Sequence, residues 1–155
     1  MSSDLYILGD ERNEPKGYSK SVVSPQNQSA ILGILKAALN RNASDIHFQV
    51  GSYPIFRIDG LLSPYTAVSA VNSQFMTECS NLFLNEKQKK YLAENRQIDC
   101  SVTLPDFTHR FRINFFYQRN HMSGVFRANP ITPPTISQLG LPPLMEKLVA
   151  LPHGL

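Results

Sequence analysis

The clearest pattern along the chain is the alternation of apolar and polar residues in RFRINFFYQ, residues 110–118. A period of two is typical of a half-buried β-strand. The apolar positions form a core face, so Arg110 and Arg112 belong to the opposite face. The segment 122–128 predicts a partner strand that forms a hairpin with the first.

Other stretches predict further strands. SDIHFQV, residues 44–50, alternates strictly, and QIDCSVTL, residues 97–104, reads as another strand. IFRID, which ends at Asp59, is followed by Gly60 and then by LLSPY, and the dipeptide Asp59-Gly60 favours a tight hairpin turn.

Helical spacing of apolar residues predicts helices between these strands. Ser29 is a candidate N-cap for the first helix and Asn42 a candidate end. Asn85 and Gln88 have the spacing of a capping box, in which each side chain bonds to the other's backbone N–H. The predicted helices are residues 29–42, 70–84, 85–96 and 144–151.

The order of helices and antiparallel strands predicts an α+β domain. The 155 residues suffice for one domain, which we divide into three parts. Residues 1–28 lack periodicity and are expected to form a flexible N-terminal tail. Residues 29–130 form the folded domain, and residues 131–155, which are rich in proline, form a connector with a short helix.

Composition excludes several classes of protein. With 42% hydrophobic and 17% charged residues the chain is globular, and no apolar run is long enough to span a membrane. No secretory signal is recognisable at the N-terminus. Cys79 and Cys100 are read as buried thiols of a cytoplasmic protein, with a disulfide left open.

The positive charge is concentrated in residues 107–130, which hold four arginines and no acidic residue. A two-residue turn at Arg119-Asn120 would place Arg127 directly opposite Arg112 on the same face of the hairpin. This arrangement would leave positive charge unpaired, which suits either two solvated surface arginines or a bound anion such as phosphate.

Other polar residues have plainer interpretations. Asp45 and His47 share a strand face, but the remaining histidines lack metal-ligand spacing, so we expect structural hydrogen bonds or subunit contacts and no metal site. Arg57 is a surface residue or pairs with Asp59, Asp99 or a neighbouring subunit. Nucleic-acid binding is not expected, because most aromatic rings beside the arginines alternate into the core.

Several stretches together resemble one known family. ASDIHFQVGSYPIFRIDGLL, then RFRINFFYQRN, GVFRANP, ISQLGLP and the final LPHGL are similar, in order and spacing, to the N-terminal segments of type IV pilus retraction and secretion ATPases, the PilT-like motors. The resemblance covers about residues 29–155.

The resemblance implies a PAS-like α+β domain that precedes a RecA-like ATPase domain in a hexameric twitching-motility or secretion motor. It implies that Arg112 and Arg127 contact the phosphates of ATP as catalytic and nucleotide-binding residues, with Arg119 as a third candidate. The expected partners are the RecA-like domain, neighbouring subunits of a homohexamer and the pilus or secretion platform. The expected location is cytoplasmic, peripheral at the inner membrane.

The chain departs from the family in lacking the G-x-x-x-x-G-K-[ST] loop that cradles phosphates and holds Mg²⁺. ATP and Mg²⁺ are therefore expected to bind through an absent ATPase domain, and this fragment alone is not expected to hydrolyse ATP. The expected function is a nucleotide-sensing and oligomerisation domain. The alternative is a stand-alone adaptor that binds a pilus or secretion partner without nucleotide.

Overall fold

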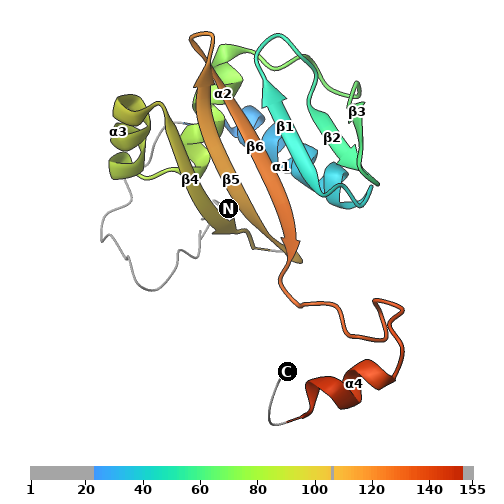
Figure 1. Cartoon of the computed structure of the whole chain (residues 1–155). Helices are drawn as coiled ribbons and strands as arrows, with labels where there is room; N and C mark the ends of the chain where they lie inside the picture. Colours follow the sequence, from blue (N-terminus) through green and yellow to red (C-terminus); the bar gives the residue numbers. More distant parts are fainter. Residues whose placement is uncertain (1–22, 106, 152–155) are drawn as a thin grey trace.

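The computed structural model describes residues 23–105 and 107–151, which contain a six-stranded antiparallel sheet with flanking helices (Figure 1). The sheet has the strand order β3-β2-β1-β6-β5-β4. This arrangement confirms the predicted α+β fold class. The elements in chain order are α1 (Pro25–Leu39), β1 (Asp45–Gln49), β2 (Ile55–Ile58), β3 (Leu61–Pro64), α2 (Ser73–Phe83), α3 (Glu86–Asn95), β4 (Gln97–Thr103), β5 (His109–Gln118), β6 (His121–Pro130) and α4 (Leu144–Val149).

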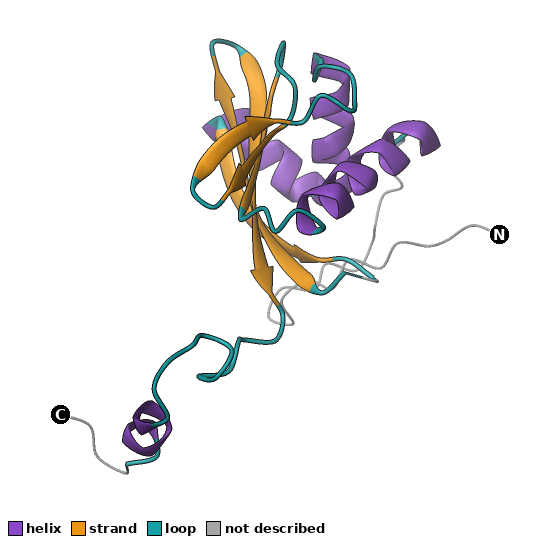
Figure 2. Ribbon diagram, turned by 90° about the vertical axis from the view of Figure 1, so that its right-hand side faces the viewer, coloured by secondary structure: helices purple, strands orange, loops and turns teal. Residues whose placement is uncertain are grey.

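The helices cover only one face of the sheet. Helices α1 and α2 pack together behind it, and α3 lies beside β4 at its edge (Figures 1 and 2). Seen from the side, none of the described helices or strands lies over the opposite face, which we call the open face (Figure 2). Polar side chains on that face are therefore available for binding.

The β5–β6 hairpin has the predicted two-residue turn. Arg119 and Asn120 adopt positive φ angles of 49° and 64°, the left-handed conformation that a tight hairpin needs at both central positions. The register then places Arg112 directly opposite Arg127. The β2–β3 hairpin turns in the same way at Asp59 and Gly60, as the sequence predicted.

The core lies between the sheet and the helices, with Phe126 of β6 at its centre. The Phe126 ring contacts the rings of Phe48, Phe83 and Phe115 edge-on, at centroid separations of 5.2–5.7 Å. This is the geometry that aromatic rings prefer, because the positive edge of one ring meets the negative face of another. One residue thus links β1, β5 and β6 to α2.

Helix α1 begins earlier than the sequence predicted. Its N-cap is Ser24, whose side chain accepts a hydrogen bond from the backbone N–H of Asn27, and Pro25 occupies the first turn. The prediction of Ser29 as N-cap is wrong, because the fixed φ of proline suits the start of a helix. Residues 25–28, assigned to the tail, are therefore helical, while residues 1–22 lie outside the described part of the chain.

Helix α3 begins as predicted. The side chain of Asn85 accepts from the backbone N–H of Gln88, and the side chain of Gln88 accepts from the backbone N–H of Asn85. The capping box is therefore confirmed.

Glu78 of α2 ties the start of α1 to the helical layer. Its carboxylate accepts hydrogen bonds from the backbone N–H and the hydroxyl of Ser24 and from the side chain of Gln74. The hydrogen bonds from Gln74, Ser24 and Asn27 outweigh the opposing effect of burial and lower the pKa of Glu78 to about 2.

The segment that follows β6 has a different character. Helix α4 is the short helix predicted near the C-terminus, and it has no buried residue. It lies beyond the end of the sheet, reached by an extended stretch from β6 (Figure 1). The large apolar side chains exposed between residues 131 and 151 are Ile131, Leu139, Leu141, Leu144, Met145, Leu148, Val149 and Leu151.

Replacing Phe126 by alanine should lower the free energy of unfolding by about 3–5 kcal/mol, because a cavity would open where three rings converge. Val125, the next residue along β6, is only half-buried and faces the other side of the sheet. Urea denaturation of F126A beside V125A measures the difference, and equal losses for both variants would contradict the central position of Phe126.

The hydrogen bonds to Glu78 should make the fold sensitive to acid. Because the folded pKa of Glu78, about 2, is below its ordinary value of 4.5, this stabilisation is present above pH 4.5 and is lost as the pH falls towards 2. We expect the melting temperature of E78Q to fall less than that of the wild type across this window. The control is E94Q, which alters an exposed carboxylate of α3 and should keep the full wild-type fall.

Candidate functional site

Four charged residues form a row across the middle of the open face. Strand pairing places Asp45 of β1 opposite Arg57 of β2 on one side and opposite Arg127 of β6 on the other. Arg127 in turn lies opposite Arg112 of β5. Residues directly opposite in a sheet share a face, so the row is Arg57, Asp45, Arg127, Arg112. The predicted pair, Arg112 and Arg127, is therefore brought together.

Asp45 is the only member of this row that is buried. Its carboxylate accepts a hydrogen bond from Arg127 Nε at 2.9 Å and from the Ser44 hydroxyl at 2.8 Å, and Arg57 Nε lies 3.5 Å away. Burial alone would raise the pKa of Asp45. The hydrogen bonds from Ser44 and Arg127 and the charges of Arg127 and Arg57 outweigh it, so the pKa is lowered and the carboxylate stays ionised.

The expectation that the arginines of the hairpin carry unpaired charge is wrong for Arg112 and Arg127. Asp45 pairs with Arg127 across 82 residues of sequence, and Asp99 of β4 lies 3.4 Å from Arg112 Nε. Both carboxylates come from strands that flank the hairpin, outside the sequence window that holds the arginines. The local charge count missed them, because pairing across a sheet joins segments that are distant along the chain.

Arg57 also has a partner that the sequence analysis did not name. It pairs with Asp45, not with Asp59 or Asp99, and its Nη1 donates to the carbonyl of Gly60 in the β2–β3 turn. The alternation of β1 and β2 could have placed Arg57 on the face of Asp45, but only the register makes them neighbours.

The row keeps donors available for an anion. Within the described residues, the guanidinium of Arg127 makes one hydrogen bond, through Nε, and that of Arg112 makes only its ion pair with Asp99. The terminal nitrogens of both side chains are thus left without a hydrogen bond, and both side chains are about two-thirds exposed. The three arginines of the row, together with Asp45 and the neighbouring Asp99, leave one net positive charge. Paired guanidiniums of this kind can bind phosphate oxygens in bidentate fashion.

Arg119 lies apart from this pair. It sits in the turn, one residue beyond Gln118 and seven beyond Arg112 along the chain. At a rise of roughly 3.3 Å per residue the two backbone positions are about 20 Å apart. A single phosphate held between Arg112 and Arg127 does not reach Arg119.

His47 lies beside the row on the same face of β1. Its cross-strand neighbours are Ile55 and Val125, and its Nε2 is buried without a hydrogen-bond partner among the described residues. Burial lowers the pKa of the imidazole, the Asp45 carboxylate raises it and Arg57 lowers it, with a net lowering. His47 is therefore neutral at pH 7.

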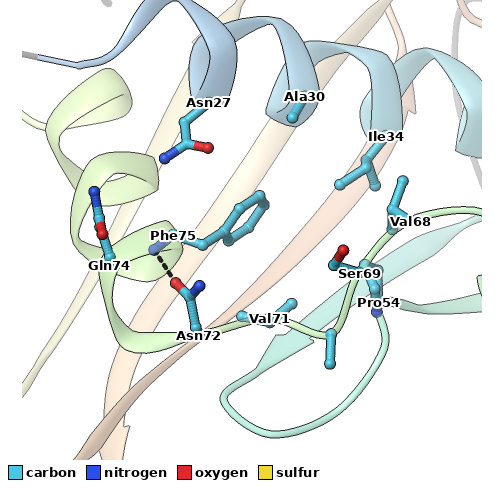
Figure 3. A pocket seen from close by; sticks show the side chains of 11 residues that line it. Asn27, Ala30, Ile34, Pro54, Val68, Ser69, Val71, Asn72, Gln74 and Phe75 are labelled. Atoms are coloured by element: carbon cyan, nitrogen blue, oxygen red, sulfur yellow. Dashed lines mark hydrogen bonds between the residues drawn. The ribbon is translucent and has the colours of Figure 1, made fainter.

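A pocket of about 360 Å³ lies on the helical side, between α1, the β3–α2 loop and α2 (Figure 3). Phe75 and Ile34 point into it (Figure 3). Its polar side chains are largely committed to the fold: Asn72 caps α2 through the N–H of Phe75, and Gln74 donates to Glu78. The pocket therefore has fewer polar side chains available to bind a ligand than the open face.

Other kinds of site receive no support within residues 23–105 and 107–151. No group of three or more His, Cys, Asp or Glu residues there could hold a metal ion. Cys79 is buried, Cys100 is half-buried and both are free thiols. None of the helices in this part of the chain has the length and apolar character needed to cross a membrane.

Comparison with known proteins points to one family. The chain is 28% identical to the type IV pilus ATPase PilU of Pseudomonas aeruginosa over 122 residues, covering 79% of this chain and 31% of PilU. It is 29% identical to the retraction ATPase PilT of the same organism, covering 81% of this chain and 36% of PilT. No family model matches the chain.

The fold agrees with these matches. The crystal structure of the pilus retraction motor PilT with bound ADP has a TM-score of 0.66 to this chain at 34% identity, covering 76% of this chain and 34% of that one. The chain belongs to the PilT-like ATPase family, in which it matches the N-terminal domain. The Legionella pneumophila ATPase DotB, at 21% identity and a TM-score of 0.59, shares the fold.

The chain spans about a third of the length of these PilT-like relatives. Its match to the N-terminal region of these relatives supports the interpretation of the chain as a fragment of a pilus or secretion ATPase.

The surroundings of His47 predict how it titrates. By NMR, its imidazole should titrate below its ordinary pKa of 6.5. The D45N variant should lower this pKa further, because it removes the charge that raises it, and R57Q should raise it. Since the folded pKa is lowered, the contribution of His47 to stability is lost as the pH falls below 6.5. A pKa that moved the same way in both variants would contradict this charge arrangement.

Proposed function

We propose that this domain senses nucleotide in a PilT-like pilus retraction or secretion motor. In this proposal Arg112 and Arg127 extend towards the phosphates of an ATP molecule held by a RecA-like ATPase domain. They stabilise the negative charge that develops around the γ-phosphate during transfer. The sequence contains no G-x-x-x-x-G-K-[ST] phosphate loop, and no group of three or more His, Cys, Asp or Glu residues within 23–105 and 107–151 could hold a metal ion.

One observation carries the proposal: Arg112 and Arg127 lie directly opposite each other on the open face, and among the described residues their terminal nitrogens have no hydrogen-bond partner. Like charges opposite each other in a sheet cost about 0.2–1 kcal/mol. An anion between them would turn this repulsion into two charge-assisted contacts. Membership of an ATPase family makes the phosphates of ATP the natural anion.

The finer parts of the proposal follow the family resemblance. ATP and Mg²⁺ would bind through the ATPase domain, and Arg119, at the far end of the hairpin, would meet a different surface from the Arg112–Arg127 pair. The PAS-like domain would contribute to a homohexamer at the cytoplasmic side of the inner membrane, next to the pilus or secretion platform.

Residues 131–151 would act as the connector to the ATPase domain. Their exposed apolar side chains, among them Leu144, Leu148 and Val149, are the kind that become buried when two domains pack together. Movement about this connector would close the open face over the nucleotide. The folded domain would then be residues 23–130.

The arginine pair is tested in a protein that joins this chain to the part of Pseudomonas aeruginosa PilT that lies outside the match. Replacing Arg112 and Arg127 by alanine should lower the kcat for ATP hydrolysis by roughly 10- to 1000-fold, as loss of groups that stabilise transition-state charge does elsewhere. Steady-state phosphate release measures the effect.

The control is K87A, which removes an exposed positive charge from α3, outside the arginine row. It should retain the kcat of the unmodified fusion. Full activity in the double arginine variant would refute the proposed role. If that variant also still bound a component of the pilus machinery, the adaptor function would be favoured instead.

A further inference from the structure

The guanidinium of Arg127 is divided between two tasks. Its Nε donates to Asp45 Oδ1 at 2.9 Å, and its terminal nitrogens make no hydrogen bond within the described residues. A guanidinium is planar and carries five donors in a fixed fork, so fixing one N–H also fixes the direction of the others. The side chain is nonetheless 64% exposed. Asp45 therefore orients a guanidinium that is otherwise accessible to solvent.

Asp45 is well anchored for this task. Its side chain is 8% exposed and accepts from the Ser44 hydroxyl on Oδ2, while Oδ1 is left to Arg127. Arg57 holds it from the other side, and Arg57 is itself attached to the β2–β3 turn through the carbonyl of Gly60. A carboxylate fixed at this many points can hold the arginine that it binds.

We propose that Asp45 is a positioning residue: it holds Arg127 by Nε so that the terminal nitrogens present a preorganised fork to a phosphate group. This inference rests on the proposed function, because it takes the Arg112–Arg127 pair as the anion site. It adds that Arg127 is the oriented member of the pair and that a residue which itself repels anions increases the affinity for them.

Asp99 of β4, which lies beside the row next to Arg112, offers a contrast. It lies 3.4 Å from Arg112 Nε without forming a hydrogen bond, and its side chain is 55% exposed. Asp99 therefore offsets the charge of Arg112 but does not fix the direction of its guanidinium. Among the described residues, two aspartates thus lie beside the two arginines, and of these two Asp45 has the geometry of a positioning residue.

Substitution of the two aspartates should have opposite effects on the binding of inorganic triphosphate to the whole chain. Charge alone predicts that removal of either carboxylate tightens binding, by roughly two- to threefold at low salt. Positioning predicts that D45N weakens binding by about three- to tenfold in spite of the gained charge, because the fork is no longer preorganised. D99N should follow the charge prediction and bind more tightly.

The titration is followed through the ¹⁵Nε–¹Hε NMR signals of Arg112 and Arg127. In the ligand-free chain, D45N should also abolish the protection of the Arg127 Hε proton against exchange with water, while D99N should not. This signature separates orientation of the side chain from a general effect on folding, which far-UV circular dichroism monitors.

A second variant decides the matter if D45N does not fold. R127K keeps the charge of an exposed side chain, but a single ammonium group cannot bond to Asp45 through one nitrogen and present a separate fork. It should weaken triphosphate binding to an extent similar to D45N. Binding at wild-type strength by R127K would overturn the inference.

The remaining outcomes separate the inference from the proposed function. If the wild type binds triphosphate and D45N binds as tightly as D99N, the positioning role is refuted and the anion site stands. If triphosphate leaves the Arg112 and Arg127 signals of the wild type unchanged, the anion site is refuted, and the role of Asp45 with it.

Discussion

The register of the β5–β6 hairpin is the constraint on which both the core and the arginine row depend. It is set by two residues, Arg119 and Asn120, in left-handed conformations. Side chains alternate between faces with a period of two, so one more residue in this turn would exchange the faces of β6. Phe126 would leave the aromatic core and Arg127 would enter it. The turn that directs Phe126 into the aromatic core therefore also places Arg127 on the open face.

The second requirement is the central position of β1, between β2 and β6. A carboxylate on the open face of β1 has a neighbour on each side, and both neighbours of Asp45 are arginines. An unpaired carboxylate would be costly to bury, whereas two guanidiniums and the Ser44 hydroxyl stabilise the ionised form. The same contacts that make Asp45 tolerable in its buried position give it control over the direction of Arg127.

The features predictable from sequence were those decided by near neighbours. The alternation of apolar and polar residues in 110–118 predicted which face of the sheet carries Arg112, and the two-residue turn predicted Arg127 opposite it. The spacing of Asn85 and Gln88 predicted where α3 begins. The carboxylate partners could not be found in this way, because β1 and β4 reach the hairpin only through the strand order of the sheet. Helix α1 was misplaced for a similar reason: its first turn is polar and is held by Glu78, 54 residues from Ser24.

The balance of charge in the row bears on how such a domain could act. The three arginines of the row, Asp45 and the neighbouring Asp99 together leave a single net positive charge, and at an exposed surface one charge is screened within about 8 Å at physiological ionic strength. Such a row binds free phosphate only weakly. Under the proposed function this weakness is useful, because an anion already held by another domain adds the missing contacts and brings the two surfaces together. A strongly positive face would bind free nucleotide tightly whether or not that domain was present. Under the proposed function the aspartates would therefore make the response of the row depend on the presented nucleotide, while Asp45 would keep Arg127 oriented towards it.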